Sequence, residues 1–311
     1  MTALRNLFLT LALLLLALVP ASAASRFGVC TVTCTWDGSS TAMWSTSSGG
    51  ATGASVPGSG DTVTFDAATC VGGVTCTITV NTTVNISTLT VGACTASTTG
   101  CILDFSANNN NVTTPNISFS GTGTRTINMG SGTWTITSAS STVFDNFTTT
   151  NETLSGASAS LVFSANTTSG RNIYGGGKTF GSLTVNNTSS AAINLGTSAT
   201  FASLSSSVGQ CFILNNGVTV TFSSAFTLVG TAAAPLCFMS STTTGTNATI
   251  SIASGTATIA WGVFQNMTFT GGATFTASNS LDVRGYNATT GITITPPSTG
   301  GGGGHIIGGG L

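Results

Sequence analysis

Few side chains in this sequence can take part in acid–base chemistry. Its 311 residues include seven Asp or Glu, six Lys or Arg and a single histidine. Asp145 and Glu152 lie close together, and Arg171 and Lys178 follow after a short interval. Two carboxyl groups that face each other can cleave a glycosidic bond, and a basic residue can take the proton next to a uronate carboxyl group. These four residues are therefore the candidates for a polysaccharide lyase or glycoside hydrolase site.

No recognised motif supports catalysis by these candidates. The sequence has no Asp-x-Asp pair, and its only histidine, His305, lies in a glycine-rich tail where a Ser–His–Asp triad is not expected. The absence of a Cys-x-x-Cys motif argues against a zinc site, and we expect neither a metal nor another cofactor. A net charge of −1 leaves no basic surface for nucleic acid. These features favour a non-enzymatic protein.

Eight cysteines form the second set of chemically informative residues. An even number in an exported chain predicts disulfides. Cys70 and Cys76 enclose a Gly-Gly pair and indicate a hairpin, and the spacing of Cys211 and Cys237 suits neighbouring coils of a solenoid. Many other pairings are possible, so the connectivity stays open at this point. The disulfide candidates are Cys30, Cys34, Cys70, Cys76, Cys94, Cys101, Cys211 and Cys237.

Residues 1–23 have the features of a secretory signal peptide. Arg5 is followed by an apolar run over residues 7–19, and Ala21-Ser22-Ala23 fits the small-x-small cleavage rule. The run is shorter than the ~20 residues that cross a membrane, although an uncleaved anchor remains the alternative. No later stretch is long and apolar enough to span a bilayer as a helix. We therefore expect a protein that is secreted or held at the cell surface.

The rest of the chain predicts an all-β fold. Runs of four to six residues rich in Thr, Val, Ile and Phe alternate with period two, and Gly, Asn and Ser separate them. Phe180-Gly181-Ser182-Leu183 and Phe201-Ala202-Ser203-Leu204 are similar to each other, and such repeats recur at multiples of about 20 residues. We expect a single-stranded, right-handed parallel β-helix over residues 67–295, with one or two β-sandwiches as the alternative.

A segment rich in tryptophan and glycine precedes the repeats. Trp36 and Trp44 are followed by Gly49-Gly50 and by the pattern P-x-x-G-D-T-V-x-F over residues 57–65. This opening resembles the start of secreted right-handed β-helix proteins, among them autotransporter-like proteins of the bacterial surface and phage virion or tail proteins. The resemblance implies an N-terminal cap over residues 24–66, with Trp36 and Trp44 in its core. It also implies display outside the cell, and phage proteins of this type are often trimers.

Residues 296–311 contain so much glycine that they predict a flexible tail. A docking peptide that enters a groove of a partner is the alternative. Its apolar or aromatic anchors would be His305, Ile306, Ile307 and Leu311.

These features lead to one functional hypothesis and one alternative. The hypothesis is a structural or adhesive β-helix on a cell surface or virion, whose Thr, Ser and Asn faces contact glycans or partner subunits. The alternative is a polysaccharide lyase or glycoside hydrolase on the same scaffold, because the fold alone does not separate the two. The sequence leaves the ligand and the oligomeric state open.

Overall fold

The structure is a computed structural model, and it describes most of the chain that follows residue 22. The described residues are 23–92, 94, 100–138, 142–164, 170–187, 192–241, 246–283 and 287–298. Most of the predicted signal peptide, residues 1–22, lies outside them, as do Arg284 and the tail from residue 299. No helix among the described residues is long and apolar enough to cross a membrane.

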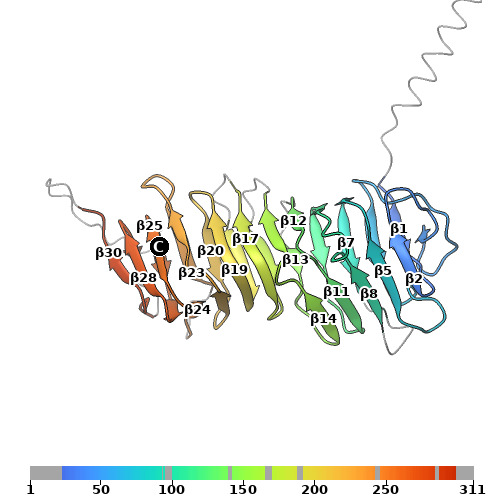
Figure 1. The fold of residues 1–311 in the computed structure, drawn as a ribbon. Coiled ribbons are helices and arrows are strands. Elements are labelled where there is room, and N and C mark those ends of the chain that lie inside the picture. The colour runs from blue at the N-terminus through green and yellow to red at the C-terminus, as the bar shows by residue number, and fades with distance from the viewer. Residues whose placement is uncertain are drawn as a thin grey trace, which may run out of the picture.

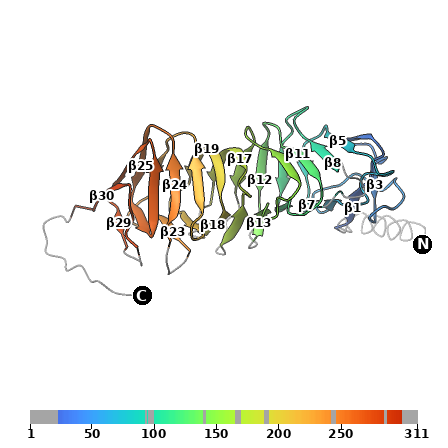
Figure 2. The same ribbon diagram turned by 90° about the horizontal axis from the view of Figure 1, so that it is seen from below.

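The chain forms an elongated rod whose strands lie across the long axis (Figures 1 and 2). Two sheets run along most of the rod, and they contain twelve and nine strands. The twelve-stranded sheet comprises, in spatial order, β3 (Trp44–Ser45), β1 (Ser25–Gly28), β4 (Thr62–Phe65), β7 (Thr88–Val91), β10 (Asn116–Ser118), β13 (Thr142–Asp145), β16 (Arg171–Tyr174), β18 (Ala192–Thr197), β20 (Cys211–Leu214), β23 (Leu236–Ser240), β26 (Gly262–Gln265) and β29 (Leu281–Asp282). The nine-stranded sheet comprises β6 (Val84–Asn85), β9 (Val112–Thr114), β12 (Thr133–Ile136), β15 (Ser160–Phe163), β17 (Thr179–Val185), β19 (Ala199–Ser206), β21 (Thr219–Phe222), β24 (Ala248–Ile252) and β27 (Met267–Gly271).

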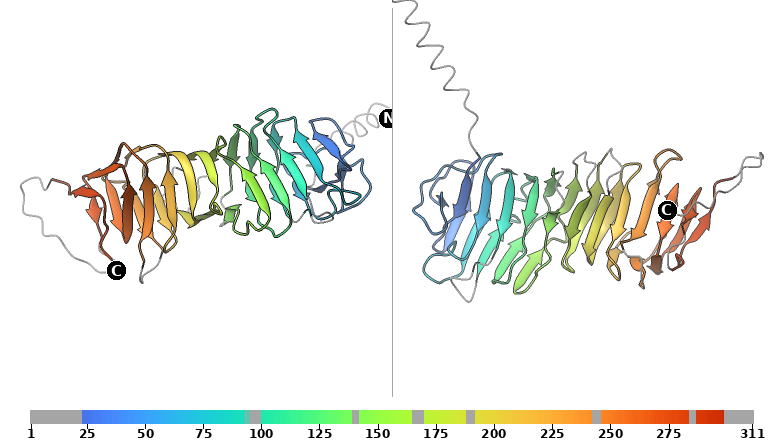
Figure 3. Two further views of the ribbon diagram at one scale, coloured as in Figure 1. Left: turned by 60° about the horizontal axis from the view of Figure 1, so that its bottom comes forward. Right: turned by 180° about the vertical axis from the view of Figure 1, so that it is seen from behind.

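Two shorter sheets complete the sides of the rod. A five-stranded sheet belongs to the N-terminal half and a four-stranded sheet to the C-terminal half (Figure 3). The five-stranded sheet comprises β2 (Thr33–Trp36), β5 (Cys76–Val80), β8 (Cys101–Asp104), β11 (Arg125–Asn128) and β14 (Glu152–Ser155). The four-stranded sheet comprises β22 (Thr227–Val229), β25 (Thr256–Ala260), β28 (Thr274–Ser278) and β30 (Thr293–Thr295).

Successive coils pair in parallel along these sheets, which confirms the parallel β-helix and excludes the β-sandwich alternative. Among the named strands only β1 and β3 pair antiparallel. The coil length is not a constant 20 residues. Thr88 pairs with Asn116, a step of 28 residues, whereas Ala192 pairs with Cys211, a step of 19. The longer of these coils contains three strands, β7, β8 and β9, whereas the shorter contains two, β18 and β19, and the loops also differ in length.

The third side of the rod changes position halfway along the chain. In the N-terminal half, a coil runs from the twelve-stranded sheet through the five-stranded sheet to the nine-stranded sheet, as β7, β8 and β9 do. In the C-terminal half, the third strand instead follows the nine-stranded sheet, as in β23, β24 and β25. The two coils that begin with β16 and with β18 contain two strands each, so β14 is the last strand of its sheet.

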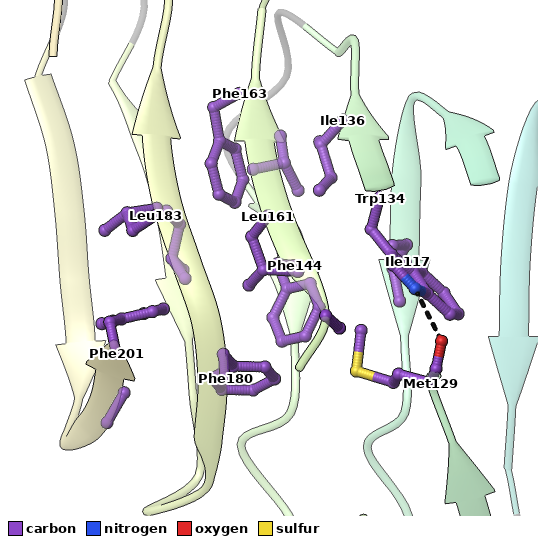
Figure 4. Close-up of a cluster of buried hydrophobic side chains, with 14 of the residues drawn as sticks. Ile117, Met129, Trp134, Ile136, Phe144, Leu161, Phe163, Phe180, Leu183 and Phe201 are labelled. Carbon is purple, nitrogen blue, oxygen red and sulfur yellow. Dashed lines mark hydrogen bonds between the residues drawn. The ribbon is translucent and has the colours of Figure 1, made fainter. Parts of the chain in front are cut away.

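The core consists of rows of apolar side chains that stack along the axis. Phe180 of β17 pairs in register with Phe201 of β19, which pairs with Phe222 of β21, and the ring centroids are 5.6 and 5.9 Å apart. Figure 4 shows Phe144 beside Phe180 at the end of this row, and a second row that contains the paired residues Trp134, Leu161 and Leu183. The two Phe-x-Ser-Leu segments therefore lie side by side, as their similarity predicts, with Thr and Ser alternating on the outer surface.

Aromatic residues close the N-terminal end of the core. Trp36 and Trp44 are buried, and their rings meet edge to face with centroids 5.1 Å apart, while Phe65 packs against both. Burial makes these indoles part of the packing rather than an exposed surface for sugars. β4, which ends the predicted cap segment, pairs with β1 on one side and with β7 on the other.

All eight cysteines form disulfides, as predicted. Three of the bonds lie at one corner of the first coils, and the fourth, Cys211–Cys237, joins directly paired residues of β20 and β23 with Cα atoms 4.4 Å apart. The hairpin predicted at Cys70–Cys76 is wrong, because this turn leads from the twelve-stranded sheet to β5 in a different, parallel sheet. The other pairs are Cys30–Cys34, Cys70–Cys76 and Cys94–Cys101.

Candidate functional site

Glu152 is the centre of a buried polar cluster. Its side chain is fully buried, and its Oε2 atom accepts a hydrogen bond from Nη2 of Arg125 at 2.9 Å. Its Oε1 atom accepts a hydrogen bond from Nδ2 of Asn146 at 3.1 Å and lies 3.4 Å from Nζ of Lys178. Both carboxylate oxygens are therefore occupied by partners from the protein itself.

Arg125 holds the loops around this cluster together. Its Nε, Nη1 and Nη2 atoms donate to backbone carbonyls at 2.7–3.2 Å, in addition to the bond with Glu152. These bonds use all the N–H groups of the guanidinium and join the loop before β11 to the equivalent loop of the next coil. Five carbonyls accept these bonds, those of Phe119, Gly121, Gly123, Thr148 and Thr150.

The register of the five-stranded sheet places these residues in one inward-facing row. Cys76, Cys101, Arg125 and Glu152 occupy equivalent positions on β5, β8, β11 and β14. The next coil has no strand on this side, because residues 175–178 cross directly from β16 to β17. Lys178 at the end of this crossing sends its ammonium group back, and Nζ donates to the backbone carbonyl of Glu152 at 3.1 Å. The ammonium group of Lys178 therefore lies next to Glu152, the last residue of this row.

Glycine makes the direct crossing possible. Gly176 has a φ of 63°, in the left-handed region that favours glycine. A Cβ atom at this position would collide with the carbonyl oxygen of Asn146. A side chain here would push the crossing segment away from the cluster, and with it Lys178.

A groove of about 840 Å³ lies beside the cluster, where the five-stranded sheet ends. Turns of four successive coils form its walls, so it extends for roughly 14 Å along the rod axis. Most of its side chains are hydroxyls and amides, and Lys178 is its only charged residue. Its lining residues are Ser106, Asn109, Asn128, Gly130, Ser131, Leu154, Ser155, Gly156, Ala157, Ser158, Gly177, Lys178 and Thr179.

Of the four catalytic candidates, the structure brings only Glu152 and Lys178 into contact. Asp145 lies at the end of β13, where its Oδ1 atom accepts a hydrogen bond from the Phe147 backbone N–H at 3.2 Å. Its partner across the sheet is Tyr174, on the outer surface of the twelve-stranded sheet. The predicted arrangement of all four residues on one face is therefore not seen, because coil lengths differ from the assumed repeat.

Arg171 lies in the core rather than on a surface. Its side chain is buried, and its guanidinium carbon lies 5.9 Å from the ring centroid of Phe163. Its three guanidinium nitrogens have no hydrogen-bond partner in the described part of the chain. Burial lowers the pKa of Arg171 below its ordinary value because it disfavours the charged form. A cation in this position has no access to a substrate in the groove.

Two surface features were not anticipated from the sequence. Phe147 is 63% exposed and meets the ring of Tyr174 edge to face, with centroids 5.4 Å apart. A second hollow of about 260 Å³ lies on the outer face of the four-stranded sheet, and five of its eleven lining residues are threonines. Alternation within each strand is the signal that could have placed these threonines on the outer face. The juxtaposition of Phe147 with Tyr174, by contrast, depends on the pairing of β13 with β16.

Comparisons with known proteins and a search for metal ligands do not extend this description. No protein-family model, curated protein or solved structure matches the chain. The described residues contain no group of three or more His, Cys, Asp or Glu side chains that could hold a metal ion. The groove and the Glu152 cluster are therefore the features of the described chain that bear on its function.

Proposed function

We propose that the protein is a non-enzymatic, extracellular β-helix rod that binds glycans in the groove beside Glu152. Four disulfides, a composition with few charges and the predicted signal peptide support an extracellular location. The resemblance of residues 36–66 to displayed β-helix proteins supports attachment to a cell surface or a virion. In either setting the rod acts as a rigid structural or adhesive element.

The occupied state of Glu152 is the observation that carries this proposal. A glycosidase needs a carboxyl group that can reach the glycosidic oxygen or the anomeric carbon. The side chain of Glu152 is fully buried, and Arg125, Asn146 and Lys178 contact its carboxylate oxygens. The groove beside it offers hydroxyl and amide groups, which suit the hydroxyls of a saccharide. The arrangement supports binding without bond cleavage.

A combined binding and turnover assay tests the proposal. The oxidised mature chain, residues 24–311, is mixed with a panel of bacterial and plant polysaccharides. Binding, new reducing ends and the absorbance of unsaturated uronates are recorded in the same samples. We expect binding to at least one polysaccharide with no new reducing ends and no unsaturated product.

Substitutions in the groove and in the cluster give the matched controls. Ser155→Trp, which narrows the groove from its exposed wall, should reduce binding, whereas Thr62→Trp on a remote outer face should not. Product that disappears in Glu152→Gln or Lys178→Ala would establish the lyase or hydrolase alternative. If Ser155→Trp and the parent chain bound the polysaccharide equally well, the groove would not be the binding site.

A further inference from the structure

The groove has an uncompensated positive charge at the end of the row formed by Arg125 and Glu152. Arg125 and Lys178 share the single negative charge of Glu152, and no residue that lines the groove is Asp or Glu. We infer that the groove selects anionic glycans and that Lys178 binds their carboxylate or sulfate groups. This inference rests on the proposed function and names its ligand class.

Lys178 is the member of the cluster that can reach a ligand. Arg125 is fully buried, and its N–H groups donate hydrogen bonds to five carbonyls and to Glu152. The side chain of Lys178 is 21% exposed and is part of the groove lining. The charge that Arg125 brings to the cluster therefore neutralises Glu152 and leaves the charge of Lys178 for the groove.

Within the described part of the chain, the ammonium group of Lys178 makes one hydrogen bond and keeps donors for a ligand. It carries three N–H donors. One donates to the backbone carbonyl of Glu152 at 3.1 Å, and Nζ also forms an ion pair with the Glu152 carboxylate at 3.4 Å. These two contacts hold the ammonium in place before the ligand arrives. A held donor loses less entropy on binding than a mobile surface lysine does.

Asp104 is an acidic residue near the groove, and its carboxylate accepts hydrogen bonds from Ser106. Asp104 lies in the same outward row as Asn128 and Ser155, two residues of the groove. Its Oδ1 atom accepts hydrogen bonds from the backbone N–H of Ser106 at 2.9 Å and from the Ser106 hydroxyl at 2.6 Å. These bonds hold the Asp104 carboxylate in its own turn, and it is not among the residues that line the groove, whereas Lys178 is.

The shape of the groove suits a linear chain. Turns of four coils line it in succession, and a Cβ atom added at Gly177 would meet no other atom within 4 Å, so this wall is open. Hydroxyls of Ser131, Ser155 and Ser158 can contact sugar hydroxyls along its length. Uronates and sulfated sugars both present anionic oxygens to an ammonium group, and the experiment below separates them.

A single lysine in the whole chain makes the inference directly testable. Lys178 and the N-terminal amine are the only primary amines of the mature protein. Incorporation of ¹³C-labelled lysine gives a single set of side-chain NMR signals, those of Lys178, and leaves its charge and its three N–H donors unchanged. The probes are two matched pairs, namely homogalacturonan against its methyl ester and dextran sulfate against dextran. Single-stranded DNA serves as a polyanion that is not a glycan.

We expect the Lys178 signal to shift with homogalacturonan or dextran sulfate and to stay unchanged with the methyl ester, dextran and DNA. A shift with homogalacturonan identifies carboxylate as the preferred anion, and a shift with dextran sulfate identifies sulfate. Lys178→Met should weaken binding of that member about tenfold or more, to the level of its neutral counterpart, and Lys178→Arg should retain most of it. Thermal unfolding of each variant shows whether the fold is intact.

A gain-of-charge variant keeps the test independent of the buried cluster. Ser158 is exposed on the groove wall and is not among the polar partners of Glu152, which are Arg125, Asn146 and Lys178 in the described part of the chain. Ser158→Lys should therefore strengthen anionic binding and leave neutral glycans unaffected. Equal binding of charged and neutral members, or an equal shift with DNA, would overturn this inference and leave glycan binding standing. If no polysaccharide bound at all, the proposed function itself would fail.

Discussion

Two arginines occupy the interior of the rod, and their surroundings are opposite. Arg125 donates to five backbone carbonyls and pairs with Glu152. Arg171 contacts the face of Phe163 and has no hydrogen-bond partner among the described residues. A buried charge is costly unless hydrogen bonds and an opposite charge offset its desolvation. The same side chain should therefore stabilise the fold at one position and destabilise it at the other.

Methionine substitution tests this contrast at the residue scale. Arg125→Met leaves the Glu152 carboxylate without its closest cation and should lower the free energy of unfolding by about 3–5 kcal/mol. Arg171→Met replaces an unpaired charge with an apolar side chain of similar length and should raise it by about 1–4 kcal/mol. Urea unfolding of both variants measures the two changes. Equal destabilisation by both substitutions would contradict this account of Arg171.

At the scale of single elements, alternate residues of a strand carry unequal weight. Phe201 of β19 is buried between Phe180 and Phe222, whereas its neighbour Thr200 points outward. Phe201→Ala should cost about 3–5 kcal/mol, because it opens a cavity in the aromatic row. Thr200→Ala should change stability by no more than about 0.5 kcal/mol. Denaturant unfolding checks both values, and a similar cost for the two would argue against the observed register.

The disulfides should contribute according to the length of chain that they enclose. Cys211–Cys237 spans 26 residues and joins two coils, whereas Cys30–Cys34 spans four. On the chain-entropy model, removal of the first bond costs about 3.5 kcal/mol and removal of the second about 2 kcal/mol. Double alanine variants of each pair, unfolded in urea, give the comparison. A larger loss for the Cys30–Cys34 pair would show that local strain or packing outweighs chain entropy here.

For the whole molecule, the small number of charges limits the response to pH. Its single histidine lies in the tail, and all eight cysteines are oxidised, so little titrates between about pH 5 and 9. Asp37 titrates below this range, because hydrogen bonds from the backbone N–H groups of Ser40 and Ser39 hold its pKa below the ordinary 3.8. A carboxyl group with a lowered folded-state pKa stabilises the fold above its ordinary pKa, and this contribution is lost on acidification.

The melting temperature should therefore stay nearly constant from about pH 5 to 9 and fall below about pH 4. Asp37→Asn keeps an oxygen that can accept both backbone hydrogen bonds but does not titrate. This variant should show a smaller loss on acidification than the parent chain. Thermal unfolding monitored by circular dichroism across the pH range measures both curves. A steady decline between pH 8 and 5 would show that buried ionisable groups dominate the stability.

Much of the architecture could be predicted from the sequence because it depends on local alternation. In Phe180-Gly181-Ser182-Leu183 and in the threonine-rich runs, the side-chain pattern has the period of a strand, and this period decides which residues face inward. The scarcity of charged residues along so many runs then favours a stacked β-helix with polar outer faces. The even number of cysteines, together with the predicted export, indicated disulfides. This inference does not require knowledge of which cysteines pair.

The groove and its cluster depend on features that only the tertiary structure decided. Contacts between coils follow from register, and register follows from the length of every loop, which here makes one coil 28 residues long and another 19. Small differences in loop length bring Lys178 onto Glu152, send Arg171 into the core and leave Asp145 on another face. The sequence by itself determined which residues face inward or outward on each strand. Which of them meet is a property of the folded coil, because the number of residues between paired strands differs from coil to coil and the alternation within one strand does not reveal it.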